Sequence, residues 1–181
     1  MKKNIYYLTG FMASGKSTIG PILANTLGWD HFDLDKEIEK TIGKKVTEIF
    51  KTFGEPYFRK VETDLLKELS QKNKSIISLG GGTIADPVNY KIIKTSGHFI
   101  YLKSSPEMAY KRLVFKRDRP NILLDDDNEP TKEQIMERIN LLIEQRKKYY
   151  EKADYILDTD TESVGKTVDK ISRFIRSNKD K

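Results

Sequence analysis

The residues most able to do chemistry lie near the amino terminus, in a glycine-rich stretch. Gly10 to Ser17 has the sequence Gly-Phe-Met-Ala-Ser-Gly-Lys-Ser, which fits the pattern G-x-x-x-x-G-K-[ST] in full. Gly10 and Gly15 allow backbone angles that side chains disfavour, so successive N–H groups can converge on phosphate oxygens. Lys16 can reach the β- and γ-phosphates, and Ser17 offers a hydroxyl ligand to Mg²⁺. The pattern predicts a nucleotide phosphate site but does not identify the second substrate.

Two acidic residues, Asp33 and Asp35, stand two positions apart where a second short strand is expected to end. Both can point towards one mouth if the strand ends there and the chain turns. One carboxylate near Mg²⁺ and another near an acceptor hydroxyl would suit phosphoryl transfer. Alternatively, Asp35 simply caps a helix that begins at Lys36. The spacing alone leaves both interpretations open.

Two arginines and a run of glycines are candidates for the second substrate. Arg59 and Arg146 can each be a surface ion-pair partner, Arg59 with Glu55 or Glu62. Each can also clamp a carboxylate, because the planar guanidinium fork donates two parallel hydrogen bonds. The run Gly80-Gly81-Gly82 follows an apolar segment, where it would permit close approach of a ligand at the edge of a sheet.

The elements that must position these residues follow from hydrophobic periodicity and from capping signals. Strands are predicted at residues 5–9, about 31–33, 75–79, 99–102 and 155–157. Helices are predicted after Lys16 and at residues 36–42, 46–53, from 56 onwards, 87–94, 106–115, 132–150 and 164–175. Gly54 is expected to stop a helix, and Thr131 with Gln134 forms a capping box. Alternating strands and helices imply an α/β fold, with a parallel sheet covered by helices on both faces.

Composition excludes several classes of protein. The chain has 181 residues, 37% of them hydrophobic, and no cysteine, which rules out disulfide frameworks and thiolate chemistry. Its two histidines are too few and too isolated for a metal site, and no apolar run approaches the roughly 18 residues of a membrane span. The net charge of +6 suits binding of a polyanionic small molecule. The sequence has no basic stripe interleaved with aromatic residues, so it does not indicate binding of nucleic acid. A single soluble, cytoplasmic domain covering residues 1–181 is expected.

The motifs, taken in order, resemble the shikimate kinase family over nearly the whole chain. The segments that carry the resemblance are the loop from Gly10 to Thr18, Asp33-Leu34-Asp35 with Glu37-Ile38-Glu39, Glu48-Ile49-Phe50, Gly54-Glu55 with Phe58-Arg59 and Glu62, Leu79 to Gly82, Arg119-Pro120, and Arg146 before Tyr150. The glycine loop is shared by many nucleotide-binding proteins. The Asp-x-Asp pair, the Phe-Arg step and the three glycines are specific in combination.

The resemblance implies a fold like that of nucleoside monophosphate kinases: a five-stranded parallel sheet, a substrate-binding helical region at about 34–62 and a lid at about 116–130. It implies transfer of the γ-phosphoryl group of MgATP to the 3-hydroxyl of shikimate, giving shikimate 3-phosphate and ADP for aromatic amino acid biosynthesis. It also suggests a monomer whose partners are ATP and shikimate, with Mg²⁺ as the cofactor.

The resemblance also implies a role for each matching position. The catalytic residues would be Lys16, Asp35 and Arg119. ATP would be bound by Gly10, Ala13, Ser14, Gly15, Lys16, Ser17, Thr18, Arg112 and Arg119. Shikimate would be bound by Asp35, Arg59, Gly81, Gly82 and Arg146. The Mg²⁺ site would consist of Ser17 and Asp33.

The chain departs from the family pattern at several positions, and other functions also fit parts of the sequence. Asn121-Ile122 replaces a usual Leu-Leu pair after Pro120, and Asp125 to Asp127 make the expected lid acidic. The rival functions are another small-molecule kinase, acting on gluconate or a nucleoside monophosphate, and a shikimate-binding regulatory module without turnover. Such a module would be expected to have lost Lys16, Asp35 or Arg119, and the chain has kept all three.

Overall fold

A five-stranded parallel sheet forms the centre of the molecule. The computed structural model describes residues 4–114 and 130–178. The strands are β1 (Ile5–Thr9), β2 (Asp30–Asp33), β3 (Ser75–Ser78), β4 (His98–Lys103) and β5 (Tyr155–Asp158), in the spatial order β2-β3-β1-β4-β5. All four strand pairings are parallel. This confirms the α/β fold and the five-stranded sheet that the sequence and the resemblance predict.

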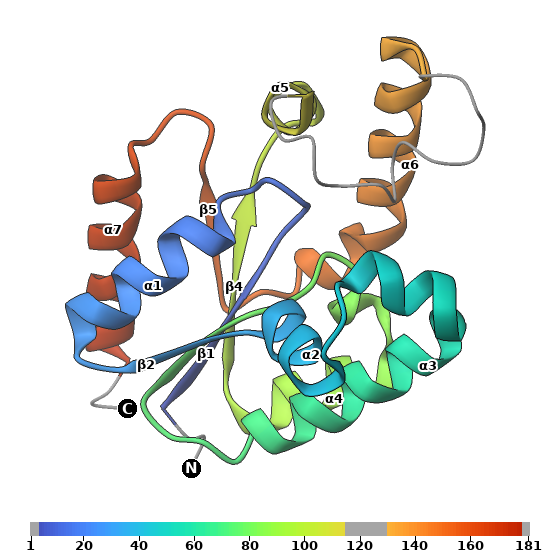
Figure 1. Cartoon of the computed structure of the whole chain (residues 1–181). Helices are drawn as coiled ribbons and strands as arrows, with labels where there is room; N and C mark the ends of the chain where they lie inside the picture. The colour runs from blue at the N-terminus through green and yellow to red at the C-terminus, as the bar shows by residue number, and fades with distance from the viewer. Residues whose placement is uncertain (1–3, 115–129, 179–181) are drawn as a thin grey trace.

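Helices cover both faces of this sheet (Figure 1). The helices are α1 (Lys16–Leu27), α2 (Leu34–Ile42), α3 (Val46–Leu69), α4 (Pro87–Ser96), α5 (Pro106–Val114), α6 (Lys132–Tyr150) and α7 (Val164–Ser177), with a 3₁₀ turn η1 at Thr83–Ala85. Helices α1 and α7 lie on one side of the sheet, and α2, α3 and α4 lie on the other (Figure 1). Helices α5 and α6 stand beyond the end towards which the strands point.

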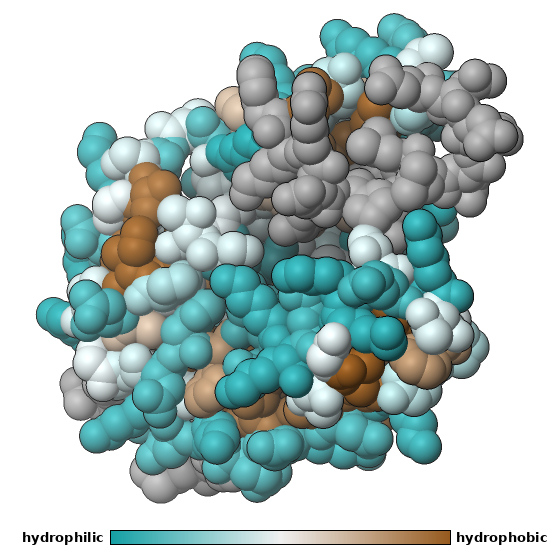
Figure 2. Space-filling model, in the orientation of Figure 1, coloured by the Kyte–Doolittle hydropathy of each residue, from teal (hydrophilic) through white to brown (hydrophobic). Residues whose placement is uncertain are grey.

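The core follows from the alternation of side chains along the central strand. Tyr6 and Leu8 of β1 pack with apolar residues of α1 and α7, whereas Ile5 and Tyr7 pack with apolar residues of α2, α3 and α4. A parallel strand at the centre of such a sheet is therefore apolar on both faces. A third cluster joins Phe11, in the loop after β1, to α5 and α6. On the face drawn in Figure 2, hydrophilic residues predominate and apolar ones form only small, separate patches.

Local signals set most of the helix boundaries. Asp86 accepts hydrogen bonds from the backbone N–H groups of Val88 and Asn89, which starts α4 at Pro87 as predicted. The predicted capping box of Thr131 and Gln134 starts α6. Gly54 has φ 79° and ψ 169°, so α3 is two helical segments joined across a kink. The predicted break is therefore confirmed.

Two further predictions concern a membrane span and a lid. Within residues 4–114 and 130–178, no helix is long and apolar enough to cross a membrane. The expected lid at about 116–130 lies, apart from Pro130, outside the described residues.

Candidate active site

The loop between β1 and α1 has the backbone that its glycines permit. Gly10 has φ 152° and Gly15 has φ 100°, which are conformations that side chains rarely adopt. A Cβ on Gly10 would lie only 2.6 Å from the carbonyl oxygen of Leu102 and from Oγ of Ser14. Ala13 also has a positive φ of 61°. The loop therefore requires glycine at its first position for both backbone and steric reasons.

Lys16 is the cation of this loop. It is 9% exposed, and its Nζ donates hydrogen bonds to the carbonyl oxygens of Gly10 at 2.8 Å and Phe11 at 3.0 Å. A phosphate oxygen is a charged acceptor and forms stronger hydrogen bonds than these neutral carbonyls do. The ammonium group is thus held beside the position where phosphates are expected.

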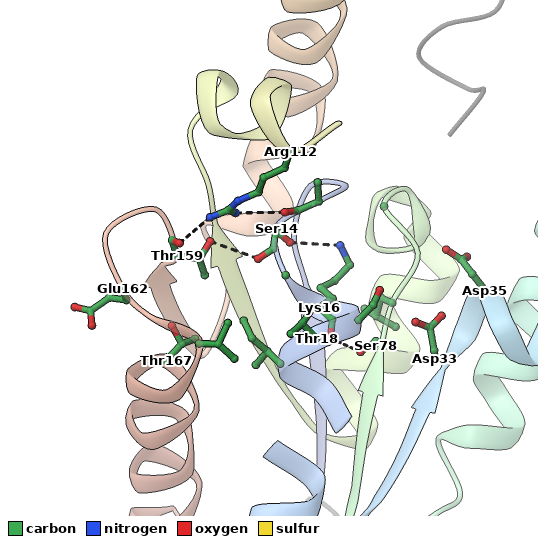
Figure 3. A pocket seen from close by; sticks show the side chains of 17 residues that line it. Ser14, Lys16, Thr18, Asp33, Asp35, Ser78, Arg112, Thr159, Glu162 and Thr167 are labelled. Atoms are coloured by element: carbon green, nitrogen blue, oxygen red, sulfur yellow. Dashed lines mark hydrogen bonds between the residues drawn. The ribbon is translucent and has the colours of Figure 1, made fainter. Parts of the chain in front are cut away.

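A pocket surrounds this loop at the carboxyl ends of the strands (Figure 3). It is lined by Ala13 to Ile19, Asp33, Asp35, Ser78, Leu79, Gly81, Arg112, Thr159, Glu162, Val164 and Thr167. Figure 3 shows Asp33 and Asp35 together on one side of Lys16, with Thr159, Glu162 and Thr167 on the other. The pocket thus extends from the expected acceptor side, across the phosphate loop, to the β5–α7 connection.

Seven of these lining residues were not predicted as site residues from the sequence: Ile19, Ser78, Leu79, Thr159, Glu162, Val164 and Thr167. Ser78 is the last residue of β3, and Thr159 directly follows β5. Ligands of open parallel sheets bind outside the carboxyl ends of the strands, so the ends of the predicted strands were the signal for these two.

Asp33 and Asp35 reach the same pocket because β2 ends at Asp33 and α2 begins at Leu34. The alternative that Asp35 caps the helix is wrong. Oδ1 of Asp33 accepts the backbone N–H of Lys36 at 3.3 Å, so the cap is Asp33 and Asp35 lies in the first helical turn. The helix starts two residues earlier than predicted, which moves the capping function from one carboxylate to the other.

The three glycines after β3 leave room for three other site residues. Their φ angles lie outside the left-handed region, so the requirement is steric and does not come from backbone conformation. A Cβ would lie 2.7 Å from Oδ1 of Asp35 if placed on Gly80, 3.5 Å from Nη1 of Arg146 if placed on Gly81, and 3.0 Å from Nη2 of Arg59 if placed on Gly82. The glycines therefore permit a close approach of side chains from α2, α3 and α6. The predicted close approach of a ligand stays a prediction.

Arg59 lies between two carboxylates of α3. Its Nη1 donates to Oε2 of Glu62 at 2.9 Å, and its Nε and Nη2 both donate to Oε1 of Glu55 at 3.1 Å. Arg59 therefore pairs with both of the predicted alternatives, but only the pair with Glu55 lies at the surface. Burial alone would lower the pKa of Arg59, but the charges and hydrogen bonds of Glu62 and Glu55 outweigh this effect and raise the pKa.

Glu62 is a buried carboxylate with further support. Its side chain is 1% exposed. Oε1 accepts the hydroxyl hydrogen of Thr83 at 2.7 Å, and Oε2 accepts from Nδ2 of Asn89 at 3.4 Å. A buried carboxylate is costly unless it is paired and hydrogen-bonded, and Glu62 meets both conditions. It therefore fixes one side of the Arg59 guanidinium.

Arg146, from α6, differs from Arg59 in having a guanidinium nitrogen that is not hydrogen-bonded within the described residues. Its Nη1 is buried and has no hydrogen-bond partner among the described residues. The guanidinium carbon lies 5.8 Å from the centroid of the Phe11 ring. An unsatisfied buried donor costs free energy, about 1–3 kcal/mol, that a bound acceptor would recover. The position of Nη1 beside Gly81 is therefore suited to an anionic ligand.

Arg112 connects the phosphate loop to the β5–α7 connection. Nη1 donates to the carbonyl oxygen of Ala13 at 3.3 Å, and Nη2 donates to that of Thr159 at 3.0 Å. Asp160 lies 3.8 Å from Nη2 and accepts hydrogen bonds from Ser104 Oγ and the Ser105 N–H. Burial raises the pKa of Asp160, but these hydrogen bonds and the Arg112 charge outweigh it, so the pKa is lowered.

One predicted site residue, Arg119, lies outside the described residues. All the other predicted site residues except Gly10, Arg59, Gly82 and Arg146 line the pocket itself. Gly10 begins the loop that borders it. The other three border the acceptor side: Arg59 lies beside Gly82, and Arg146 lies beside Gly81.

A phosphate-binding loop between a parallel strand and a helix, beside two carboxylates, defines a nucleotide-dependent phosphotransferase of the P-loop class. A model of one family, shikimate kinase, matches residues 12–176. The chain belongs to the shikimate kinase family, whose members are ATP-dependent kinases.

Known relatives agree with this assignment. The chain is 44% identical to a shikimate kinase of Chlorobaculum tepidum over 172 residues, which cover 95% of this chain and 90% of that one. A crystal structure of shikimate kinase from Bacteroides thetaiotaomicron matches with a TM-score of 0.86 and 28% identity, over 95% of this chain and 98% of that one. A shikimate kinase from Acinetobacter baumannii, solved in complex with shikimate, matches with a TM-score of 0.86 and 32% identity, over 100% and 97% of the two chains.

Proposed function

We propose that this chain transfers the γ-phosphoryl group of ATP to the 3-hydroxyl of shikimate, giving shikimate 3-phosphate and ADP. The observation that carries the proposal is the buried, unsatisfied Nη1 of Arg146 beside Gly81, with Arg59 beside Gly82. Shikimate is a hydroxylated carboxylic acid, so its carboxylate suits two guanidinium groups. The complex of the Acinetobacter baumannii relative with shikimate supports the same substrate.

Asp35 would act on the hydroxyl of the acceptor. Its carboxylate lines the same pocket as the phosphate loop, and the missing side chain of Gly80 leaves space beside it. It would orient the 3-hydroxyl and accept its proton while the oxygen attacks the γ-phosphorus and the bond to ADP breaks. Arg59 and Arg146 would hold the carboxylate of shikimate and so fix which hydroxyl faces Asp35.

The nucleotide would be held by the loop and by Arg112. Backbone N–H groups from Gly10 to Thr18 would surround the phosphates, and Lys16 would neutralise charge on the group being transferred. Arg112, supported by Ala13 and Thr159, would pack against adenine. Arg119, which lies outside the described residues, is proposed as the lid arginine on the resemblance alone.

Ser17 and Asp33 fit a Mg²⁺ ion that accompanies ATP. Both side chains offer oxygen atoms, and both line the pocket beside the phosphate loop. The described residues contain no cluster of three or more His, Cys, Asp or Glu side chains, and Mg²⁺ in kinases needs only one or two protein ligands besides water and phosphate. When bound, the ion neutralises charge on the β- and γ-phosphate oxygens.

We also propose that the chain works as one cytoplasmic domain and as a monomer, without nucleic acid. The resemblance to the shikimate kinase family supports the monomer, and the absence of a basic stripe interleaved with aromatic residues in the sequence supports the lack of nucleic acid. Gel filtration with light scattering tests the monomer, and a mass of twice the 21.0 kDa chain would contradict it.

An ADP-release assay tests the function. Shikimate should release ADP, whereas gluconate, AMP and CMP should not. Turnover with one of these alternatives and none with shikimate would replace the proposed substrate. Shikimate binding by calorimetry without any turnover would instead indicate a regulatory module.

A further inference from the structure

Arg59 is held by two carboxylates that differ sharply in burial. The side chain of Glu62 is 1% exposed and that of Glu55 is 62% exposed. Glu62 accepts hydrogen bonds from α3, η1 and α4, so it belongs to the interior. Glu55 stands at the surface, directly after the kink at Gly54. One of the two carboxylates is therefore fixed, whereas the other can be displaced.

Glu55 occupies the edge of the guanidinium that a substrate carboxylate would use. Its Oε1 accepts from both Nε and Nη2 of Arg59, at 3.1 Å each. Nη2 is also the atom nearest to Gly82, where a Cβ would be 3.0 Å away. Gly82 belongs to the triple glycine that opens the acceptor side. Nη2 therefore faces the acceptor side, while Nη1 is committed to Glu62.

We propose that Glu55 is an internal stand-in for the carboxylate of the acceptor, and that shikimate displaces it from Arg59 on binding. This inference rests on the proposed role of Arg59 in holding that carboxylate. The exchange replaces one charge-assisted contact with another of the same kind, so the guanidinium keeps its orientation and its charge stays compensated throughout.

The exchange has a low cost because the Glu55 contact is weak. An ion pair four residues apart on a helix contributes only about 1 kcal/mol or less when water solvates its carboxylate, and Glu55 is 62% exposed. The buried Glu62 contact could not be exchanged in this way without leaving a charge unpaired in the interior.

This arrangement makes Glu55 a specificity-determining residue. A neutral acceptor has no charge with which to displace Glu55, so it would meet an Arg59 edge that is already occupied. An acceptor with a carboxylate can take over the same two donors. Glu55 therefore lowers the affinity of every ligand that must displace it by the same factor, but only a ligand with a carboxylate regains a charge-assisted contact with Arg59.

The test is calorimetric titration of shikimate, without nucleotide, into the wild-type chain and into Glu55→Gln. Removing the competing charge should tighten shikimate binding by about two- to fivefold, which is the value expected of an exposed ion pair. Asp64→Asn is the matched control, because Asp64 lies on the same helix and forms an exposed ion pair with Lys67 at 3.4 Å. The control should leave the affinity for shikimate unchanged.

Acetate provides a second readout that a purely structural role would not move. In Glu55→Ala the Nε and Nη2 edge is open to small carboxylates, so added acetate should weaken shikimate binding more than in the wild type. In the wild type, the tethered Glu55 competes with acetate at a high local concentration. Glu55→Gln should change the effect of acetate in the same direction but less, because its amide oxygen can still accept from Nε and Nη2.

Shikimate binding that is unchanged or weaker in Glu55→Gln and Glu55→Ala would overturn the inference and make Glu55 a support for Arg59. Arg59→Ala separates this failure from failure of the proposed site. If Arg59→Ala loses shikimate affinity while the Glu55 variants gain none, only the role of Glu55 is wrong. If Arg59→Ala binds shikimate normally, the proposed role of Arg59 is wrong as well.

Discussion

The nucleotide side and the acceptor side of this pocket are built in different ways. The phosphate loop is one contiguous segment whose function depends on backbone angles at Gly10, Ala13 and Gly15. The acceptor side is assembled from side chains of α2, α3 and α6, which meet at the three glycines after β3. A local motif therefore specifies one half, and tertiary packing specifies the other.

This difference predicts that a mutation on one side of the pocket affects the binding of only one of the two substrates. Changes on the acceptor side should affect shikimate and leave nucleotide binding intact, because the loop is complete without them. Changes around Arg112 should affect nucleotide alone. Variants that disturb both substrates equally would show that the two halves are coupled.

The largest effect is expected for Asp35→Asn. An amide cannot accept the proton of the attacking hydroxyl, so kcat should fall by about 10²–10⁴-fold. Steady-state kinetics at several Mg²⁺ concentrations measures this, and the Mg²⁺ requirement should stay near that of the wild type. Recovery of the rate on adding metal would instead assign Asp35 to the ion.

The second-largest effect is expected for Arg146→Ala. Removing the guanidinium, whose Nη1 is buried, deprives the acceptor carboxylate of a charge-assisted partner, so shikimate affinity should fall by about 10²-fold. Calorimetry with shikimate and with ATP should show the loss for shikimate alone. A comparable loss of ATP affinity would place Arg146 on the nucleotide side and contradict the division of the site.

Asp33→Asn should have a smaller effect that depends on metal. The concentration of Mg²⁺ that gives half of the maximal rate should rise by about tenfold, and excess Mg²⁺ should partly restore the rate. Because Asp33 also caps α2, the melting temperature should be recorded in parallel. Loss of stability without any change in the Mg²⁺ requirement would leave Asp33 as a cap only.

The same division explains what could be predicted from the sequence. The phosphate loop and the capping box at Thr131 could be predicted because each depends on residues within one short segment. The start of α2 was misplaced because both Asp33 and Asp35 are good caps. The choice between them depends on where β2 ends, at the pairing of Asp33 with Ser78 of β3. That pairing is a long-range contact that local signals do not contain.

The acceptor side shows this limit most clearly. The sequence offered Arg59 two possible ion-pair partners, and the structure uses both, with opposite burial. Glu62 becomes buried only because Thr83 and Asn89 approach it from η1 and α4. No local pattern around residue 62 indicates those two neighbours.

Gly82→Ala should give a moderate effect on shikimate only. The added Cβ would lie 3.0 Å from Nη2 of Arg59, so the guanidinium must shift by a few tenths of an ångström. We expect shikimate affinity to fall by about tenfold, because binding geometry tolerates little displacement. Gly165→Ala is the matched control, since its Cβ would meet nothing within 4 Å, and it should not weaken shikimate binding. Equal effects of the two substitutions would refute the steric role of Gly82.

The smallest effect is expected for Asp160→Asn, and it should depend on pH. The pKa of Asp160 is lowered in the folded chain by Ser104, Ser105 and Arg112. A carboxyl group with a depressed pKa stabilises the fold above its unfolded pKa of about 3.9, and that contribution is lost as the pH falls towards the folded-state value. The variant should therefore be less stable than the wild type at pH 7, by under about 1 kcal/mol, because the group is partly solvated.

The difference in stability between Asp160→Asn and the wild type should begin to shrink as the pH falls below about 4. It should vanish below the lowered folded-state pKa of Asp160, where both chains lack the charge. Thermal unfolding at pH 7 and near pH 3 measures this. Because Asp160 also holds Arg112 at 3.8 Å, the KM for ATP should rise slightly while shikimate affinity stays constant. A constant stability difference across this pH range would show that the carboxylate charge contributes nothing. A change in shikimate affinity would show that the nucleotide side and the acceptor side are not independent.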